Sequence, residues 1–271
     1  MKLVDCFMYF DEDLVLEIRL NTLCDYVDQF IIVEAKQDHS GKQKKLNFDI
    51  NKFSKFKDKI TYLVLSELPK NVYSIKKNWN PAHIRDQFQR NYLEKGYTKY
   101  DDEDLIMISD IDEIPNPKKI SQFNIKNKYA CFIQKNFQFK INRINITNPN
   151  WVGTKICQKK FLKSPQWLRN IKTKNRSWWQ FYKDKSPQII EDGGWHFSFL
   201  KTPELIQKKI NSFAHQEFNE EKFTNLDLIK NRLNSNKDIF DRNYSYKKIE
   251  INNEFPDYIL KNKDKLSDWI I

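Results

Sequence analysis

The segment Leu105–Pro115 (LIMISDIDEIP) limits what this chain can fold into more than any other part of the sequence. Its apolar first half follows an acidic turn and predicts a short buried strand of the kind found inside a parallel sheet. Asp110 and Asp112 stand where this strand ends, and Pro115 is expected to stop the hydrogen-bond ladder. In open α/β sheets, ligands bind beyond the carboxyl ends of the strands. The segment therefore predicts an α/β fold with two carboxylates at its ligand-binding edge.

Two carboxylates separated by one residue have two uses at such a position. An Asp-x-Asp at a strand end can place two hard oxygen ligands on one divalent cation, which then grips a diphosphate. The alternative is that both acids only cap the turn after the strand. Because the pattern is frequent by chance, its neighbours in the sequence have to decide between a Mn²⁺ or Mg²⁺ site and a turn.

The first half of the chain alternates predicted strands with predicted helices. Apolar runs predict strands at residues 3–10, 30–33, 60–65 and 105–108, and helical spacing predicts helices over 12–24 and 82–94. This order is typical of a Rossmann-like nucleotide-binding half with right-handed crossovers. Glycine-rich phosphate loops are missing from the sequence. A bound diphosphate would therefore need a metal ion and cationic side chains such as Arg85 and Arg90.

The second half predicts further elements around a stretch rich in tryptophan and cations. Strands are expected at residues 129–135 and 137–146, and helices from 202 to near 215–217, over 226–233 and over 256–269. Residues 151–182 contain Trp151, Trp167, Arg169, Arg176, Trp178 and Trp179. Aromatic faces among cations suit a platform on which a sugar ring stacks. An aromatic core with a basic rim is the alternative.

Seven motifs in a fixed order carry a resemblance to a known family. They are EIRLN at residues 17–21, VDQFIIVE at 27–34, SGK at 40–42, FQRN at 88–91, SDIDEIP at 109–115, GWHFS at 194–198 and KINSFAHQE at 209–217. With them the sequence resembles glycosyltransferase family 17, the family of the β-1,4-mannosyl-glycoprotein β-1,4-N-acetylglucosaminyltransferase that adds bisecting GlcNAc. The resemblance implies a GT-A fold, a UDP-sugar donor and an inverting, metal-dependent transfer. It does not carry the acceptor over, and a glycan or lipid-linked glycan is expected in that role.

The resemblance also implies roles for the strand-end acids and for a late histidine. Asp110 and Asp112 are expected to hold the metal ion, with the second as the direct ligand and the first near the ribose. His196, which matches the family's Trp-His-x-Ser, is expected as a further metal ligand. Its alternative role is that of a hydrogen-bonded core residue beside Gly193 and Gly194, whose backbone freedom allows close approach to a ligand.

Donor contacts are expected from two other elements. Arg90, with Asn91, would face the diphosphate or the base, because a guanidinium matches phosphate geometry. A surface salt bridge is the alternative, and Arg85 is the arginine better suited to it. Glu34 ends the second strand, where this fold often binds the nucleobase, or else is a strand-end acid in solvent.

The attacking hydroxyl needs a general base within hydrogen-bond reach. Glu191 and Asp192, next to the paired glycines, are the candidates. Glu113 competes with them, although its position directly after Asp112 also suits a residue that only orients the metal ligands. Spacing alone does not show which acid faces the acceptor.

The net charge of +11, from 47 Lys and Arg against 36 Asp and Glu, is spread along the chain. This pattern indicates a solvated surface first and peripheral contact with an anionic membrane second. The sequence shows neither a signal peptide nor an apolar run of about 20 residues. Its four scattered cysteines suit neither a zinc cluster nor a disulfide framework. A cytoplasmic protein, with contact to the inner face of the membrane, is therefore expected.

A catalytic domain over residues 1–220 is expected, with a helical extension over 221–271 packed on the same domain. Two other function classes stay open. A haloacid-dehalogenase-like phosphatase also uses Asp-x-Asp, although on its first strand and with Thr or Val where Ile114 stands. A nucleic-acid-binding protein would explain the charge, but it would set strand-end acids against phosphate. No nucleic-acid partner is therefore expected.

Overall fold

The computed structural model describes residues 1–69, 81–173, 186–212, 220–235 and 237–271. Its strands are β1 (Leu3–Met8), β2 (Gln29–Ala35), β3 (Ile60–Leu65), β4 (Leu105–Asp110), β5 (Glu113–Pro115), β6 (Tyr129–Gln138), β7 (Arg143–Asn145), β8 (Asn150–Gln158), β9 (Gln188–Ile190), β10 (Gly194–Ser198) and β11 (Tyr246–Lys248). Its α-helices are α1 (Asp13–Leu23), α2 (Pro81–Asn91), α3 (Glu94–Tyr97), α4 (Pro117–Ile120), α5 (Pro165–Asn170), α6 (Pro203–Ser212), α7 (Glu221–Thr224), α8 (Leu226–Asn234) and α9 (Asp257–Lys261). Short 3₁₀ helices are η1 (Ile50–Lys59), η2 (Lys159–Phe161) and η4 (Ser267–Trp269).

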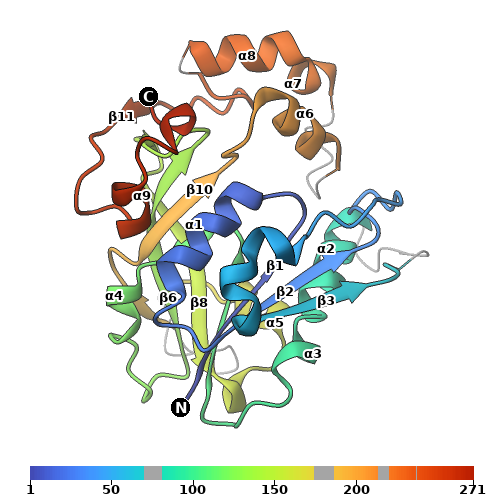
Figure 1. Cartoon of the computed structure of the whole chain (residues 1–271), viewed down its shortest axis with the longest axis vertical. Helices are drawn as coiled ribbons and strands as arrows, with labels where there is room; N and C mark the ends of the chain where they lie inside the picture. Colours follow the sequence, from blue (N-terminus) through green and yellow to red (C-terminus); the bar gives the residue numbers. More distant parts are fainter. Residues whose placement is uncertain (70–80, 174–185, 213–219, 236) are drawn as a thin grey trace, which may run out of the picture.

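The described strands form one mixed sheet, and eight of them follow the order β11-β7-β6-β8-β4-β1-β2-β3. Off this path, β10 pairs with β5 and β6, and β9 pairs with β6. On one side, β3, β2, β1 and β4 run parallel to one another. Strand β8 joins β4 antiparallel and continues the sheet to β6. Helices lie on both sides of the sheet (Figure 1). The predicted architecture, a mixed α/β sheet flanked by helices, is confirmed.

The register of the parallel strands decides where the ligand-binding edge lies. Leu3 on β1 stands opposite Leu105 on β4, and Met8 stands opposite Asp110. The carboxyl ends of β1 and β4 therefore coincide, and ligands of such sheets bind at this edge. The loop after β1, which begins at Tyr9, therefore lies beside the turn after β4.

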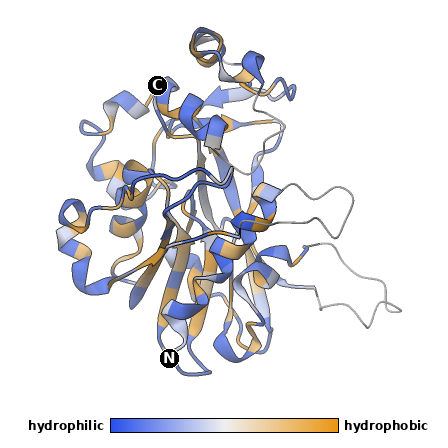
Figure 2. Ribbon diagram, turned by 90° about the vertical axis from the view of Figure 1, so that its right-hand side faces the viewer, coloured by the Kyte–Doolittle hydropathy of each residue, from blue (hydrophilic) through white to orange (hydrophobic). Residues whose placement is uncertain are grey.

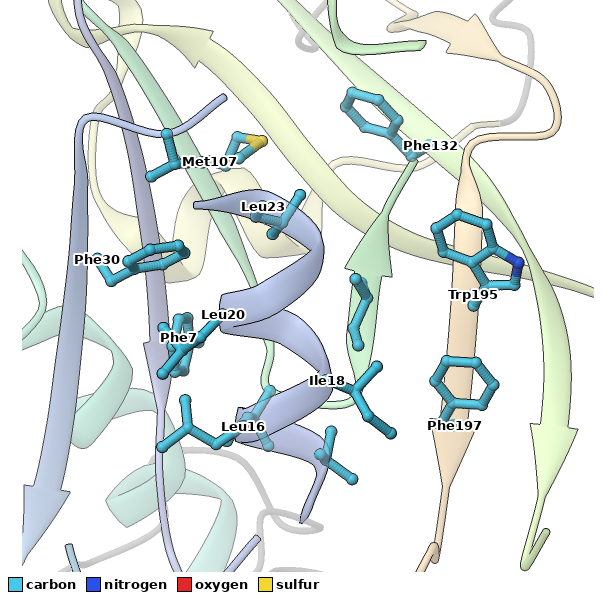
Figure 3. Packing of buried hydrophobic residues seen from close by; sticks show 14 of the residues in the cluster. Phe7, Leu16, Ile18, Leu20, Leu23, Phe30, Met107, Phe132, Trp195 and Phe197 are labelled. Carbon is cyan, nitrogen blue, oxygen red and sulfur yellow. The ribbon is translucent and has the colours of Figure 1, made fainter. Parts of the chain in front are cut away.

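Helix α1 packs between the parallel strands and β10. Leu16, Leu20 and Leu23 are buried near Phe7 and Phe30 of β1 and β2, as Figure 3 shows. Ile18 faces the other way, toward Trp195 and Phe197 on β10 (Figure 3). Fully burying each such side chain contributes about 1.5–3 kcal/mol. Apolar groups on more than one face of the helix make α1 a core element, with strands on both sides.

Hydropathy follows this arrangement over the whole molecule. Figure 2 shows hydrophobic residues along the central strands and hydrophilic residues over the surrounding loops and outer helix faces. Among the described residues, no helix has both the length and the apolar character needed to cross a membrane.

Strand β5 departs from the expectation that Pro115 stops the ladder. After a turn at Ile111 and Asp112, residues 113–115 form a strand that pairs antiparallel with β10. Gly194 permits this pairing, because a Cβ there would lie 2.1 Å from the carbonyl oxygen of Ile114 and its φ is +134°. The close approach expected of the paired glycines is therefore made to the backbone around β5.

Two further elements differ from the sequence prediction. Residues 129–135 and 137–146 were expected as two strands, but β6 is one ten-residue strand and β7 is short. Asn136 stays within β6 because its side chain bonds Asn148 O and its backbone lies beside β10. The start of the tryptophan-rich stretch is β8, a strand inside the sheet between β4 and β6.

The C-terminal segment packs on the same sheet in two places. Helices α6, α7 and α8 share a small core that contains Ile206, Ile210 and Ile229. Strand β11 pairs with β7, and Ile259 of α9 joins the main core, where α9 lies beside α1. Helices predicted over 226–233 and 256–269 correspond to α8 and to α9 with η4. The predicted end of α6 near residues 215–217 lies outside the described residues.

Candidate functional site

A buried arginine holds the turn that carries the strand-end acids. Arg19 of α1 donates from Nη1 to the carbonyl oxygens of Asp110 (3.2 Å), Ile111 (3.1 Å) and Glu113 (2.9 Å). Its Nε and Nη2 bind the carboxylate of Asp5 at 2.7 and 2.6 Å, and both side chains are fully buried. Three carbonyls and one carboxylate on a single guanidinium fix the backbone path from β4 into β5.

Glu113 lies beneath this turn as an orienting group. Its Oε1 accepts from Trp151 Nε1 at 2.6 Å and from Arg169 Nη2 at 2.5 Å. Its Oε2 accepts from Arg169 Nη1 at 2.9 Å and from the amide of Asp110 at 3.1 Å. The side chain is fully buried. Of its two predicted roles, general base and orienting residue, these contacts suit the second.

Asp110 is held between two arginines. Arg90 Nη2 lies 3.1 Å from its Oδ1, and Arg169 Nη2 lies 2.8 Å from its Oδ2. Burial alone would raise the pKa of Asp110, but Arg169 and Arg90 hold that pKa well below its usual range. The carboxylate is therefore an anion whose direction is set by α2 on one side and α5 on the other.

Asp112 and His196 lie side by side, as the sequence predicts. Unlike Asp110, whose two oxygens accept from arginines, the Asp112 carboxylate is not occupied by a hydrogen-bond donor of the described residues. His196 stands opposite Glu113 in the β5–β10 ladder, and its Nε2 lies 3.8 Å from Asp112 Oδ1. Asn136 binds the other ring nitrogen at 3.2 Å, and Trp151 stacks on the imidazole at 4.3 Å between ring centroids. No described residue donates a hydrogen bond to the Asp112 carboxylate, although its side chain is only 12% exposed.

A cavity of about 280 Å³ begins at this edge of the sheet. Its wall includes Phe10 after β1, His39 after β2, Gln89 and Arg90 on α2, and Asp112 and Lys209. The cavity thus lies beyond the carboxyl ends of the parallel strands, where the sequence places a ligand. Acidic and basic side chains both line it, which suits an anionic ligand accompanied by a cation.

The donor set around Asp112 fits a divalent ion that keeps positions open for a substrate. Among the described residues, no group of three or more His, Cys, Asp or Glu side chains is placed to hold a metal. Mg²⁺ is commonly bound by one or two carboxylates together with substrate phosphates. Asp112 offers such a carboxylate without a competing donor, and His196 offers a ring nitrogen beside it. Asp110, by contrast, already has both oxygens on arginines.

Helix α6 brings a cation to the same cavity from the C-terminal part of the chain. Lys209 Nζ lies 3.5 Å from Glu12 Oε1, and Lys201 Nζ lies 3.6 Å from the same atom. Burial would raise the pKa of Glu12, but the two lysines and the amides of Asp11 and Phe10 lower it to about 2. Burial would lower the pKa of Lys209, but Glu12 and Asp112 raise it. Both groups are therefore charged at neutral pH.

Three predicted donor contacts lie outside the wall of this cavity. Glu34 is fully buried, binds Lys44, and accepts from Asn47 N at 2.8 Å and Tyr62 Oη at 2.8 Å. Arg85 donates to the carbonyl oxygen of His39 at 3.1 Å. Asn91 accepts from the amide of Gln166 at 2.9 Å and so ties α2 to α5. Each of the three supports a loop or helix around the cavity.

The predicted bases Glu191 and Asp192 lie at the other end of β5. Both are exposed, and the carbonyl of Asp192 accepts from Asn116, which follows β5. In the β5–β10 ladder Gly194 pairs with Pro115 and His196 pairs with Glu113, so Asp192 lies beyond the Pro115 end of β5. The structure does not bring these acids to the Asp110–Asp112 turn.

Three residues of the site were missed by sequence reasoning: Arg19, Arg169 as the partner of Asp110 and Glu113, and Lys209. A signal for Arg19 existed, because an arginine at an apolar position of a buried helix needs a buried acid. Asp5, in the middle of an apolar strand, is that acid. Of the tryptophan-rich stretch, Trp151 and Arg169 reach the site, whereas residues 176, 178 and 179 lie outside the described residues.

Comparison with known proteins agrees with the motifs. No curated protein matches the chain. The family model described as "Glycosyltransferase family 17" matches residues 1–264 of the 271 residues, across both the β1–β4 half and the segment that carries β11 and α9. The resemblance carried by the seven motifs is thereby confirmed. The protein belongs to glycosyltransferase family 17 and is a glycosyltransferase.

Proposed function

We propose that this glycosyltransferase is inverting and metal-dependent, and that it moves a sugar from a UDP-sugar to a hydroxyl of a glycan or lipid-linked glycan. N-acetylglucosamine is the sugar to test first. The observation that carries the proposal is the pairing of Asp112 with His196 at the cavity beyond the parallel strands. A nearly buried carboxylate that accepts no hydrogen bond from the described residues is the group expected to bind a cation.

Mn²⁺ or Mg²⁺ at Asp112 and His196 would supply positive charge to the departing diphosphate. The chain supplies further charge through Arg90 and Lys209, which line the same cavity. Arg90 is held by Asp86 and Asp110, and its buried Nε has no partner among the described residues. A phosphate oxygen would satisfy that donor, and ionic hydrogen bonds of this kind are strong.

The nucleoside half of the donor is placed against the ends of β1 and β2. Tyr9, Phe10 and His39 line the cavity there, and the Lys44 ammonium lies 5.1 Å from the Phe10 ring centroid. Glu34 does not line this wall, so we assign it to fixing the loop that follows β2. Aromatic and amide groups at the strand ends offer a face and hydrogen bonds to a base.

The two rival classes have less support. A phosphatase of the haloacid-dehalogenase type would carry Asp-x-Asp after its first strand, but here the pair follows β4. A nucleic-acid-binding protein would not need, in the wall of a cavity, a carboxylate to which no described residue donates a hydrogen bond. Family membership also favours transfer of a sugar.

The test is UDP release from UDP-N-acetylglucosamine and related donors, with and without Mn²⁺. Release that needs the metal and is lost in Asp112→Asn supports the proposal, and Asp264→Asn, an exposed acid, is the matched control. The anomeric configuration of the product, read by NMR, tests inversion. Phosphate release from phosphomonoesters, or UDP release indifferent to chelation, would contradict it.

A further inference from the structure

A second cavity, of about 740 Å³, lies between α2, β8 and α5. Its volume is within the range of roughly 300–1,000 Å³ that small-molecule sites occupy. Among the described residues, His83 and Asp86 line both this cavity and the one proposed for the donor. They stand three residues apart on α2, which places them on the same face of the helix.

An ion-paired wall separates the two cavities next to this shared rim. Arg90 lines the donor cavity, Arg169 lines the second cavity, and both bind the carboxylate of Asp110 from opposite sides. The carboxylate that ends β4 therefore lies between the two spaces. The two cavities share a rim, where His83 and Asp86 stand.

Most charged groups of the second cavity already have partners within the protein, and Lys172, which also lines it, is exposed to water and has no ion pair among the described residues. Lys155 donates to the carbonyl oxygens of Arg169 and Ile171, the latter at 2.8 Å. Arg169 is paired with Asp110 at 2.8 Å, and Asp86 is paired with Arg90 at 2.7 Å. A charged ligand would therefore meet buried ions that already have partners and one exposed lysine, whose charge water and salt screen.

Uncharged polar side chains provide the remaining hydrogen-bonding capacity of this cavity. Gln87 and Thr173 line it, and neither side chain makes a hydrogen bond to a described residue. Amide and hydroxyl groups donate and accept together, as the hydroxyls of a sugar require. The lining therefore suits a neutral polyhydroxy ligand better than an anion.

We propose that the second cavity is the acceptor subsite and binds a neutral sugar unit of the acceptor glycan, with the reacting hydroxyl directed to the rim. This inference rests on the proposed glycosyltransfer from a UDP-sugar. At the rim, the acceptor oxygen bonds to the anomeric carbon as that carbon's bond to the UDP oxygen breaks. The hydroxyl proton passes to His83, because both oxygens of Asp86 are held by Arg90.

The first test fills the subsite. Gln87→Trp is compared with Gln122→Trp, at an exposed glutamine that lines neither cavity. The probes are neutral p-nitrophenyl mono- and disaccharides, with phosphorylated versions of the same sugars. We expect Gln87→Trp to raise the KM of the neutral acceptor about tenfold or more. UDP release without an acceptor should change less than about twofold, since the donor cavity is untouched.

The second test removes the proton acceptor. His83→Gln keeps a polar side chain of similar reach, and we expect it to lower kcat of transfer about 100-fold with the acceptor KM nearly unchanged. Thermal unfolding of His83→Gln with and without UDP and Mn²⁺ reports on folding and donor binding. If His83 only supported the structure of α2, we would not expect kcat to fall while the acceptor KM stays nearly unchanged.

The outcomes separate the two proposals. Wild-type protein that releases no UDP from any UDP-sugar overturns the donor reaction and the subsite with it. Wild-type turnover with an acceptor KM that Gln87→Trp leaves unchanged overturns the subsite alone. Preference for the phosphorylated sugars over the neutral ones also overturns it.

Discussion

Arg19 and Asp5 form a fully buried ion pair beneath the turn between β4 and β5, with Arg19 Nη2 and Asp5 Oδ1 2.6 Å apart. The same guanidinium donates hydrogen bonds from Nη1 to the carbonyl oxygens of Asp110, Ile111 and Glu113. The pair therefore couples the core of β1 and α1 to the position of the two strand-end acids. Removing either partner leaves an uncompensated buried charge, which is the costly way to break such a pair.

Arg19→Met is accordingly expected to lower the free energy of unfolding by about 3–5 kcal/mol. Arg19→Lys should recover the charge but not the forked contact to Asp5 together with the bonds to three carbonyls, because an ammonium is a compact point charge. Urea denaturation followed by circular dichroism measures both. The double variant Asp5→Leu/Arg19→Met removes both charges, and we expect it to be more stable than Arg19→Met alone. Equal stability of the single and double variants would argue against a charge-based cost.

Asp112→Asn is expected to remove the stabilisation that UDP and Mn²⁺ together give the folded protein. A ligand that binds only the folded state raises its stability in proportion to the logarithm of its concentration over Kd. An amide keeps the shape of the side chain but loses the anionic oxygen that a divalent cation needs. A thermal-shift series with UDP, with Mn²⁺ and with both measures the effect. Asp264→Asn should retain the full shift, and an equal shift in both variants would contradict a metal at Asp112.

The lowered pKa of Glu12 predicts that the folded protein loses stability in acid. Its pKa is lowered from 4.5 to about 2 in the folded protein, where Lys201 and Lys209 outweigh burial. The group therefore contributes stability that is fully present above about pH 4.5 and is lost as the pH falls toward 2. A shift of this size corresponds to about 3 kcal/mol. Unfolding free energies between pH 6 and 2.5 should fall less steeply in Glu12→Gln than in the wild type, with Glu220→Gln as an exposed control.

The double variant Glu191→Gln/Asp192→Asn decides between two sets of candidate bases. Spacing in the sequence favours these acids, but both are exposed at the far end of β5. We expect kcat of transfer to stay within about threefold of the wild type, as for a surface change away from the reaction. Steady-state kinetics with a fixed acceptor measures this. A loss of kcat of about 100-fold or more would indicate that Glu191 or Asp192 is the general base, and it would contradict that role for His83.

Local patterns were enough to predict much of the architecture. The apolar runs at β1, β2, β3 and β4 announce strands because each is short, continuous and bounded by polar residues. Strand β8 was missed, since Trp151, Gly153 and Lys155 interrupt its apolar pattern. Lys155 is tolerated inside the sheet because it donates hydrogen bonds to the carbonyl oxygens of Arg169 in α5 and of Ile171 directly after it. That compensation is not visible in the residues that flank it.

The sequence by itself determined that this is an α/β protein with Asp110 and Asp112 at the ligand-binding end of a strand, because strand periodicity and the position of the acids are local properties. Tertiary structure alone decided that Asp110 is held by Arg90 and Arg169 while Asp112 faces His196 with its oxygens open. These partners are 20 to 84 residues away along the chain. Their meeting depends on strand register and helix packing, and no local spacing encodes which of two neighbouring carboxylates is neutralised and which stays available for a ligand.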